Sequence, residues 1–175
     1  MADSALTLII LTPLAGAFLV ILAGRWPNLR EAVSIGTGLL LVAQIISVAP
    51  SVLDGSALRQ VIATPVPQLP LAFEFEPLGL LFGLIASSLW VITTIYAIGY
   101  MRGHNESNQT RFFVFFAIAI SATMGVALAA NLFTLFVFYE LLTLSTYPLV
   151  THAGTVEARQ GGRVYIGILI GTSMA

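Results

Sequence analysis

The stretch 131–150, NLFTLFVFYELLTLSTYPLV, is apolar almost throughout and carries a single carboxylate, Glu140, near its centre. As an α-helix rising about 1.5 Å per residue it would be about 30 Å long, which matches the hydrocarbon thickness of a bilayer. Glu140 would then lie about 15 Å from either surface, where a carboxylate costs about 2.5–3.5 kcal/mol on insertion scales. We therefore interpret Glu140 as a functional residue. The alternative is a protonated side chain that only bonds a neighbouring helix.

The composition identifies an integral membrane protein. Hydrophobic residues make up 58% of the 175 residues and charged residues only 9%, against about 25% charged residues in soluble domains. The net charge of −1 gives no indication of a nucleic-acid partner, and we expect none. The chain has no Cys, which excludes disulfides, thiolate metal sites and Cys nucleophiles. No motif for a cofactor, quinone or metal is visible, so we expect none of these.

The apolar runs predict an all-α polytopic membrane helix bundle that forms a single domain over 1–175. Five runs are long enough to span, and a sixth at 164–175 has only twelve residues, too few to span alone. Either another chain continues the bundle, or the sequence is a fragment. The predicted full spans are 5–24, 31–48, 77–98, 112–130 and 131–150, and 151–163 is predicted to be a polar loop.

The segment before the third span predicts a short β-strand or hairpin at the membrane surface. Four prolines between 65 and 77 exclude a regular helix there. Within it, the residues 71–76, LAFEFE, alternate in polarity. Leu71 and the two phenylalanines would share one face, whereas Ala72, Glu74 and Glu76 would share the solvated face.

The arginines predict the orientation. Six of the seven lie in or beside the predicted loops 25–30, 99–111 and 151–163, and the opposite side has only Arg59. By the positive-inside rule these three loops are cytoplasmic and the N-terminus is outside.

Helical spacing places the hydroxyls of Thr143 and Tyr147 on the face of Glu140, toward the predicted cytoplasmic side. They could hold waters and pass protons, or they could simply bond backbone and a neighbouring helix. His152 lies in the following loop and could feed such a path, because His titrates near neutral pH; the alternative is a solvated loop His.

A carboxylate that loads and unloads a proton is best controlled by a cation that approaches or withdraws. The chain contains no Lys, and we assign every Arg to a loop. We therefore expect the cationic partner of Glu140 to lie on residues outside this sequence.

The sequence resembles the antiporter-like subunits shared by respiratory complex I, membrane-bound hydrogenases and multiple-resistance-and-pH (Mrp) type cation/proton antiporters. The resemblance rests on the stretch around Glu140, with support from FEFEPLGLLFGLIASS at 73–88, IYAIGYM at 95–101 and ARQGGRVYIGILIGTS at 158–173. The residues 139–150, YELLTLSTYPLV, are most similar to the D-type branch of the Mrp subunits.

This resemblance implies a fourteen-helix bundle of two inverted repeats, of which the sequence is similar to the first five helices and the start of the sixth. It also implies that Glu140 pairs with a Lys on the seventh helix, which is supplied by a later segment or another chain. Expected partners are other membrane subunits of the same complex, the lipid bilayer and protons, with Na⁺ or K⁺ as further candidate ions. We expect the location to be a prokaryotic plasma membrane.

The sequence thus predicts a proton-translocating subunit of a multisubunit antiporter or respiratory-type complex, with Glu140 as its switching carboxylate. In a redox complex it would carry proton pumping and not the redox chemistry, so we interpret it as a transporter subunit rather than an enzyme. The alternative is a non-transporting structural subunit or truncated paralogue that packs the complex.

Overall fold

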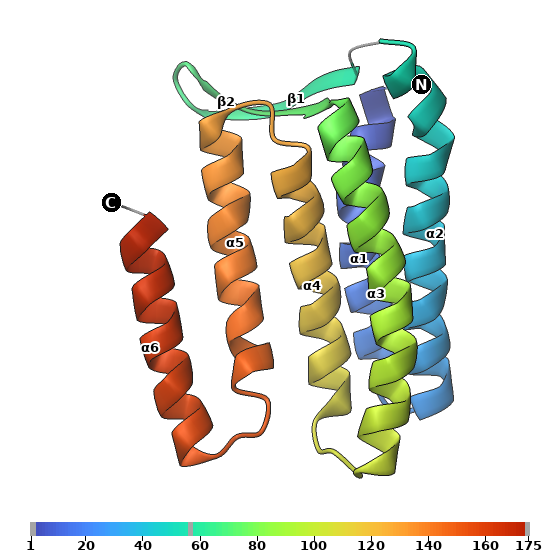
Figure 1. The fold of residues 1–175 in the computed structure, drawn as a ribbon, viewed down its shortest axis with the longest axis vertical. Helices are drawn as coiled ribbons and strands as arrows, with labels where there is room; N and C mark the ends of the chain where they lie inside the picture. Colours follow the sequence, from blue (N-terminus) through green and yellow to red (C-terminus); the bar gives the residue numbers. More distant parts are fainter. Residues whose placement is uncertain (1–2, 56–57, 174–175) are drawn as a thin grey trace.

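The computed structural model describes residues 3–55 and 58–173. Long helices run side by side and reverse direction at each connection, and a small sheet crosses one end of the bundle (Figure 1). The described elements, in chain order, are α1 (Asp3–Leu22), α2 (Pro27–Leu53), β1 (Leu58–Val66), β2 (Leu69–Phe75), α3 (Pro77–Gly103), α4 (Gln109–Ala127), α5 (Leu132–Val150) and α6 (Val156–Ser173).

Five helices, α1 to α5, are long and apolar enough to cross a membrane. The predicted all-α membrane bundle, with five spans and strands before the third, is therefore confirmed. Pro27 and Pro77 begin α2 and α3, where their missing N–H groups have no intrahelical partner to lose. The second span was predicted to end at 48, but α2 continues through Pro50 to Leu53.

The sixth helix begins earlier than predicted. Residues 156–163 were assigned to a polar loop, but they form the first two turns of α6, which is 18 residues long. The prediction located helices by their hydropathy, and the residues 157–163, EARQGGR, are polar although they are helical. Hydropathy indicates burial in a membrane and not helix formation. The prediction of a sixth helical segment was thus correct, but its predicted first residue, 164, was eight residues too late.

The segment before α3 forms an antiparallel hairpin in which Arg59 pairs with Glu74 across the strands. Phe73 and Phe75 are buried, as the alternation predicts. Ala72 is also fully buried, so its assignment to the solvated face was wrong. The reason is tertiary: the backbone of Ala72 bonds both to Ala130 and to the Thr134 side chain at the start of α5.

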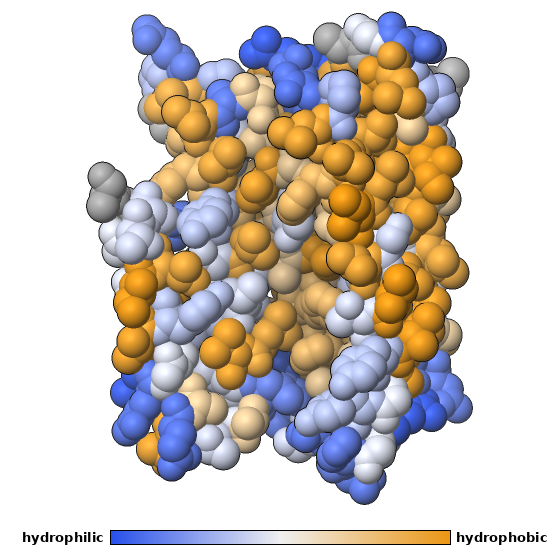
Figure 2. All heavy atoms as spheres, viewed as in Figure 1, coloured by the Kyte–Doolittle hydropathy of each residue, from blue (hydrophilic) through white to orange (hydrophobic). Residues whose placement is uncertain are grey.

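Small side chains let the helices approach closely. Gly125 of α4 lies against the ring of Phe138 of α5, and Gly38 of α2 lies against Val91 of α3. Ser121 of α4 donates a 2.7 Å hydrogen bond to the Ile10 carbonyl of α1. On the face of the molecule shown in Figure 2, apolar residues predominate between two more hydrophilic ends, as expected of a membrane-spanning bundle.

Candidate functional site

Glu140 lies near the middle of α5, on the side of that helix that faces α6. Its Oε1 accepts a hydrogen bond from the Ser173 hydroxyl at the end of α6. Within residues 3–55 and 58–173, Glu140 has no ion-pair partner. The carboxylate is therefore held by one neutral hydroxyl.

The hairpin fixes the start of the helix that carries Glu140. Asn131 caps α5, because its side-chain oxygen accepts from the Thr134 backbone N–H at 2.8 Å. The Asn131 amide donates to the Pro70 carbonyl at 2.9 Å, and the Ala72 N–H donates to the Thr134 hydroxyl at 3.0 Å. These bonds tie the first turn of α5 to β2.

Aromatic packing fixes the rotation of α5 about its own axis. The Phe138 ring fills the space left by Gly125 on α4 and meets the Phe73 ring edge-on, with ring centroids 5.3 Å apart. Glu140, two residues further along, is rotated by about 200° about the helix axis and so points away from α4. This arrangement turns the carboxylate toward α6.

Hydroxyl groups line the contact between α5 and α6. The Thr146 and Tyr165 hydroxyls lie 3.3 Å apart and share a hydrogen bond. Gly162, in the first half of α6, packs against Thr151 and the Tyr147 ring. The two helices therefore approach closely where α5 ends. The predicted site did not include Ser173, Thr146 or Tyr165. Because α6 was predicted to begin at 164, the sequence did not show which of its residues would face α5.

The predicted path residues are only partly brought together. Thr143 is buried and Tyr147 is half-buried on the helix face of Glu140, but neither side chain hydrogen-bonds the carboxylate. His152 lies just after α5, with its ring edge-on to Phe112 at 5.6 Å between centroids. Both ring nitrogens of His152 are buried and have no partner among the described residues.

A groove opens beside Glu140 along the first half of α5. It has a volume of about 410 Å³. Its walls are mostly apolar, and Ser173, which bonds the carboxylate, is among them. The lining residues are Leu132, Leu135, Phe136, Tyr139, Thr172 and Ser173.

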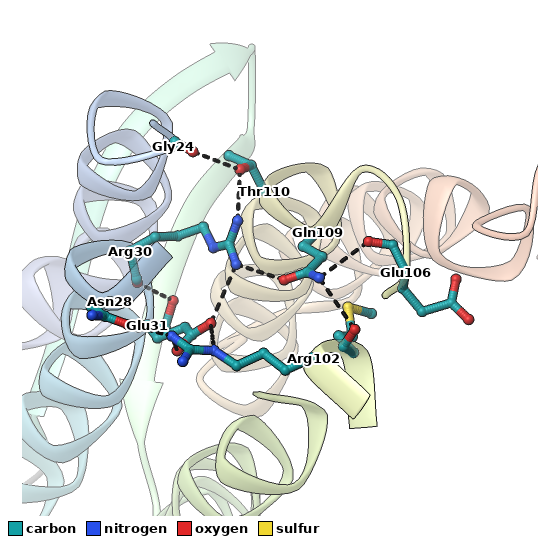
Figure 3. Close-up of polar contacts among 10 residues, drawn as sticks. Gly24, Asn28, Arg30, Glu31, Arg102, Glu106, Gln109 and Thr110 are labelled. Atoms are coloured by element: carbon teal, nitrogen blue, oxygen red, sulfur yellow. Dashed lines mark hydrogen bonds and ion pairs between the residues drawn. The ribbon is translucent and has the colours of Figure 1, made fainter. Parts of the chain in front are cut away.

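A second polar cluster, the Arg30–Glu31–Arg102 triad, lies at the end of the bundle where α2 begins (Figure 3). Arg30 and Glu31 are buried, and the Glu31 carboxylate bonds Arg102 at 2.9 and 2.5 Å and Arg30 at 3.3 Å. Arg30 also donates to Gln109 at 2.8 Å and to Thr110 at 3.2 Å. The triad joins α2, α3 and α4.

The assignment of every Arg to a loop was therefore wrong. Arg30 is in α2, Arg102 in the last turn of α3, Arg111 in α4, and Arg159 and Arg163 in α6. They still cluster at one end of the bundle, so none lies at the depth of Glu140. The described residues also hold no group of three metal-binding side chains.

Comparison with known proteins gives no match to a protein-family model. The A/B subunit of a probable K⁺/H⁺ antiporter of Rhizobium meliloti is 30% identical over 173 residues, which is 95% of this chain and 17% of that protein. A putative antiporter subunit mnhA2 of Staphylococcus haemolyticus is 32% identical over 104 residues, which is 59% of this chain and 13% of that protein. A putative antiporter subunit mnhD2 of Staphylococcus epidermidis is 29% identical over 97 residues, which is 55% of this chain and 19% of that protein.

A solved structure, the membrane-bound sulfane sulfur reductase, an archaeal respiratory membrane complex, has the same fold. One of its chains superposes with a TM-score of 0.80 at 19% identity, over 97% of this chain and 26% of that one. The chain thus spans less than a fifth of these antiporter subunits and about a quarter of the structural neighbour. By name the relatives include both A-type and D-type subunits, so the D-type assignment stays a prediction. These similarities show that the chain resembles antiporter-like membrane subunits, which it matches over one part of their length.

Proposed function

We propose that this chain is a proton-translocating part of a cation/proton antiporter or respiratory-type complex, and that Glu140 carries the proton. The observation that carries the proposal is the position of Glu140: mid-helix, held by a neutral hydroxyl, and without an ion-pair partner in the described structure. A carboxylate in an apolar environment prefers its neutral form, and an approaching cation favours the ionised form. Such a group can be loaded and unloaded by the movement of a neighbouring charge.

The groove beside Glu140 is where a controlling cation would enter. Ser173, whose hydroxyl bonds the Glu140 carboxylate, is one of the residues that line it. We expect a Lys from another segment or subunit to occupy this position. The expected orientation is N-terminus outside, with the triad end of the bundle in the cytoplasm, in a prokaryotic plasma membrane.

The route from Glu140 to the cytoplasmic end would follow the hydroxyls between α5 and α6. Thr143 and Tyr147 share the face of the carboxylate, and His152 lies beyond the end of the helix. Pro148 supports this route, because it has no N–H and leaves the Leu144 carbonyl free to bond water. The transported cation besides the proton is Na⁺ or K⁺ where the host complex is an antiporter.

A structural role is the second candidate. The hydrogen bond between Ser173 and Glu140 is what a side chain that merely joins two helices would form. In that role the subunit packs the complex and moves no ion.

Substitution of Glu140 in the complete assembly separates the two roles. Glu140→Gln keeps the size and the hydrogen-bonding capacity but cannot carry a proton, so coupled transport should fall about 100-fold or more while assembly survives. Glu140→Asp should keep partial activity, and Glu140→Ala should transport no better than Gln. Proton and cation flux in reconstituted vesicles is the measurement, and Glu157→Gln, an exposed acid on α6, is the control.

The structural role predicts a different order. Gln should be benign because it bonds Ser173 equally well, and Ala should be worst because it loosens the contact between α5 and α6. A Glu140→Gln complex that assembles and transports at the wild-type rate would refute the proton-carrier assignment.

A further inference from the structure

An open polar groove lies beside the Arg30–Glu31–Arg102 triad, far along the bundle from Glu140. It has a volume of about 480 Å³ and is formed where α2 begins and α3 gives way to the loop before α4. Pro27, Asn28, Arg102, Asn105 and Gln109 line it. Its charged side chain is Arg102, which is 47% exposed, and its other polar groups are three side-chain amides.

The charge around this groove is not balanced. Two arginines share one carboxylate, so the triad carries a net charge of +1. Both Glu31 oxygens are already engaged by the two arginines, and the Asn28 side-chain oxygen already accepts a hydrogen bond from Arg102. Glu106, in the loop before α4, directs its carboxylate away from the cluster (Figure 3). The site therefore has donors and positive charge in excess.

The groove also lies at the level of a membrane surface. It is at the ends of two apolar helices that are long enough to span, α2 and α3. Trp26 and Leu29, on either side of the groove residues Pro27 and Asn28, are 59% and 50% exposed, and Tyr100 near the end of α3 is 46% exposed. Exposed Trp and Tyr at the ends of spans are typical of the headgroup region.

We propose that this groove binds the phosphate of an anionic phospholipid headgroup. A phosphodiester offers the acceptors and the negative charge that the site lacks, and Arg binds phosphate with strong charge-assisted hydrogen bonds. Asn28 and Asn105 would donate to the same group, and the exposed Trp26 and Leu29 would contact the glycerol and upper acyl chains. A lipid is favoured over free phosphate by this apolar flank. The proposal goes beyond the proton-carrying role and does not depend on it.

Photocrosslinking in the assembled complex tests this site. Vesicles would contain either phosphatidylglycerol or phosphatidylcholine with a photoreactive group close to the headgroup. Because the chain has no Lys, trypsin releases two short peptides that flank the groove, residues 26–30 and 103–111. We expect phosphatidylglycerol to label both peptides about fivefold more than phosphatidylcholine does, the factor that one basic residue near a membrane surface provides.

Asn105 offers the variants that leave the triad intact. Arg102 also holds Glu31, so its removal could disturb folding. Asn105 has a left-handed backbone with φ 51°, which Asp and Gly also tolerate. Asn105→Asp adds a negative charge to the groove and should reduce labelling to the phosphatidylcholine level, whereas Asn105→Gly should keep labelling within about twofold because it adds no charge.

Three results would overturn the proposal. Equal labelling by the two lipids would show that the groove does not select anionic headgroups. Unchanged labelling of Asn105→Asp would place the lipid elsewhere. Loss of labelling on addition of inorganic phosphate would show a site for a free anion and not for a lipid.

Discussion

At the residue scale, the two acids that matter most have opposite surroundings. Glu140 lies in mid-bundle, and its one hydrogen-bond partner among the described residues is the Ser173 hydroxyl. Glu31 lies at the bundle end between two arginines, both of which bond its carboxylate. The same side chain therefore serves as a proposed switch in α5 and as a structural link in α2.

The link predicts that Glu31→Gln destabilises the bundle. It would leave the buried Arg30 without a counter-charge, and breaking a buried pair costs up to about 3–5 kcal/mol. The thermal unfolding midpoint of the purified protein should fall clearly, while Glu157→Gln, an exposed acid, should leave it unchanged. Equal midpoints for the two variants would show that the triad does not stabilise the fold.

At the element scale, the geometry of α5 depends on its contact with α4. A Cβ atom added at Gly125 would overlap the Phe138 ring. The ring is rigid, so the overlap cannot be relieved as it could be at the tip of a long, flexible side chain. Gly99 of α3 has nothing within 4 Å of such an atom. The two glycines thus form a matched pair in membrane-spanning helices.

Gly125→Ala should therefore destabilise the protein by about 1–3 kcal/mol through overpacking. Gly99→Ala should be neutral or stabilising by up to about 1 kcal/mol, because Ala favours the helix more than Gly does. Thermal unfolding of both variants in detergent measures the difference. Similar losses in both would mean that α4 and α5 are not packed at this point.

Sequence patterns predicted the elements better than their contacts. The five spans follow from length and hydropathy, which each segment carries by itself. The early start of α6, the burial of Ala72 and the triad depend on which segments meet in space. Glu140 was found because a lone acid in an apolar helix is visible locally, whereas Ser173 was missed because it becomes a partner only through the register of α6 against α5.

At the scale of the whole molecule, the account predicts opposite sides for the two ends of the bundle. Single Cys residues at Gln68, in the hairpin turn, and at Ser107, in the loop before α4, are both exposed in a chain that has no other Cys. A membrane-impermeant maleimide should label Ser107→Cys only from the cytoplasm and Gln68→Cys only from outside. Labelling of both from one side would contradict the number of spans.

The central claim is that Glu140 itself takes up and releases a proton during transport. Infrared difference spectroscopy of the complete assembly, with and without an imposed proton gradient, measures this most directly, because a protonated carboxyl group has a C=O stretch that the ionised form lacks. The account predicts a carboxyl band that changes with the gradient in the wild type and in Glu157→Gln and is absent in Glu140→Gln. The same band in Glu140→Gln, at wild-type intensity, would contradict it.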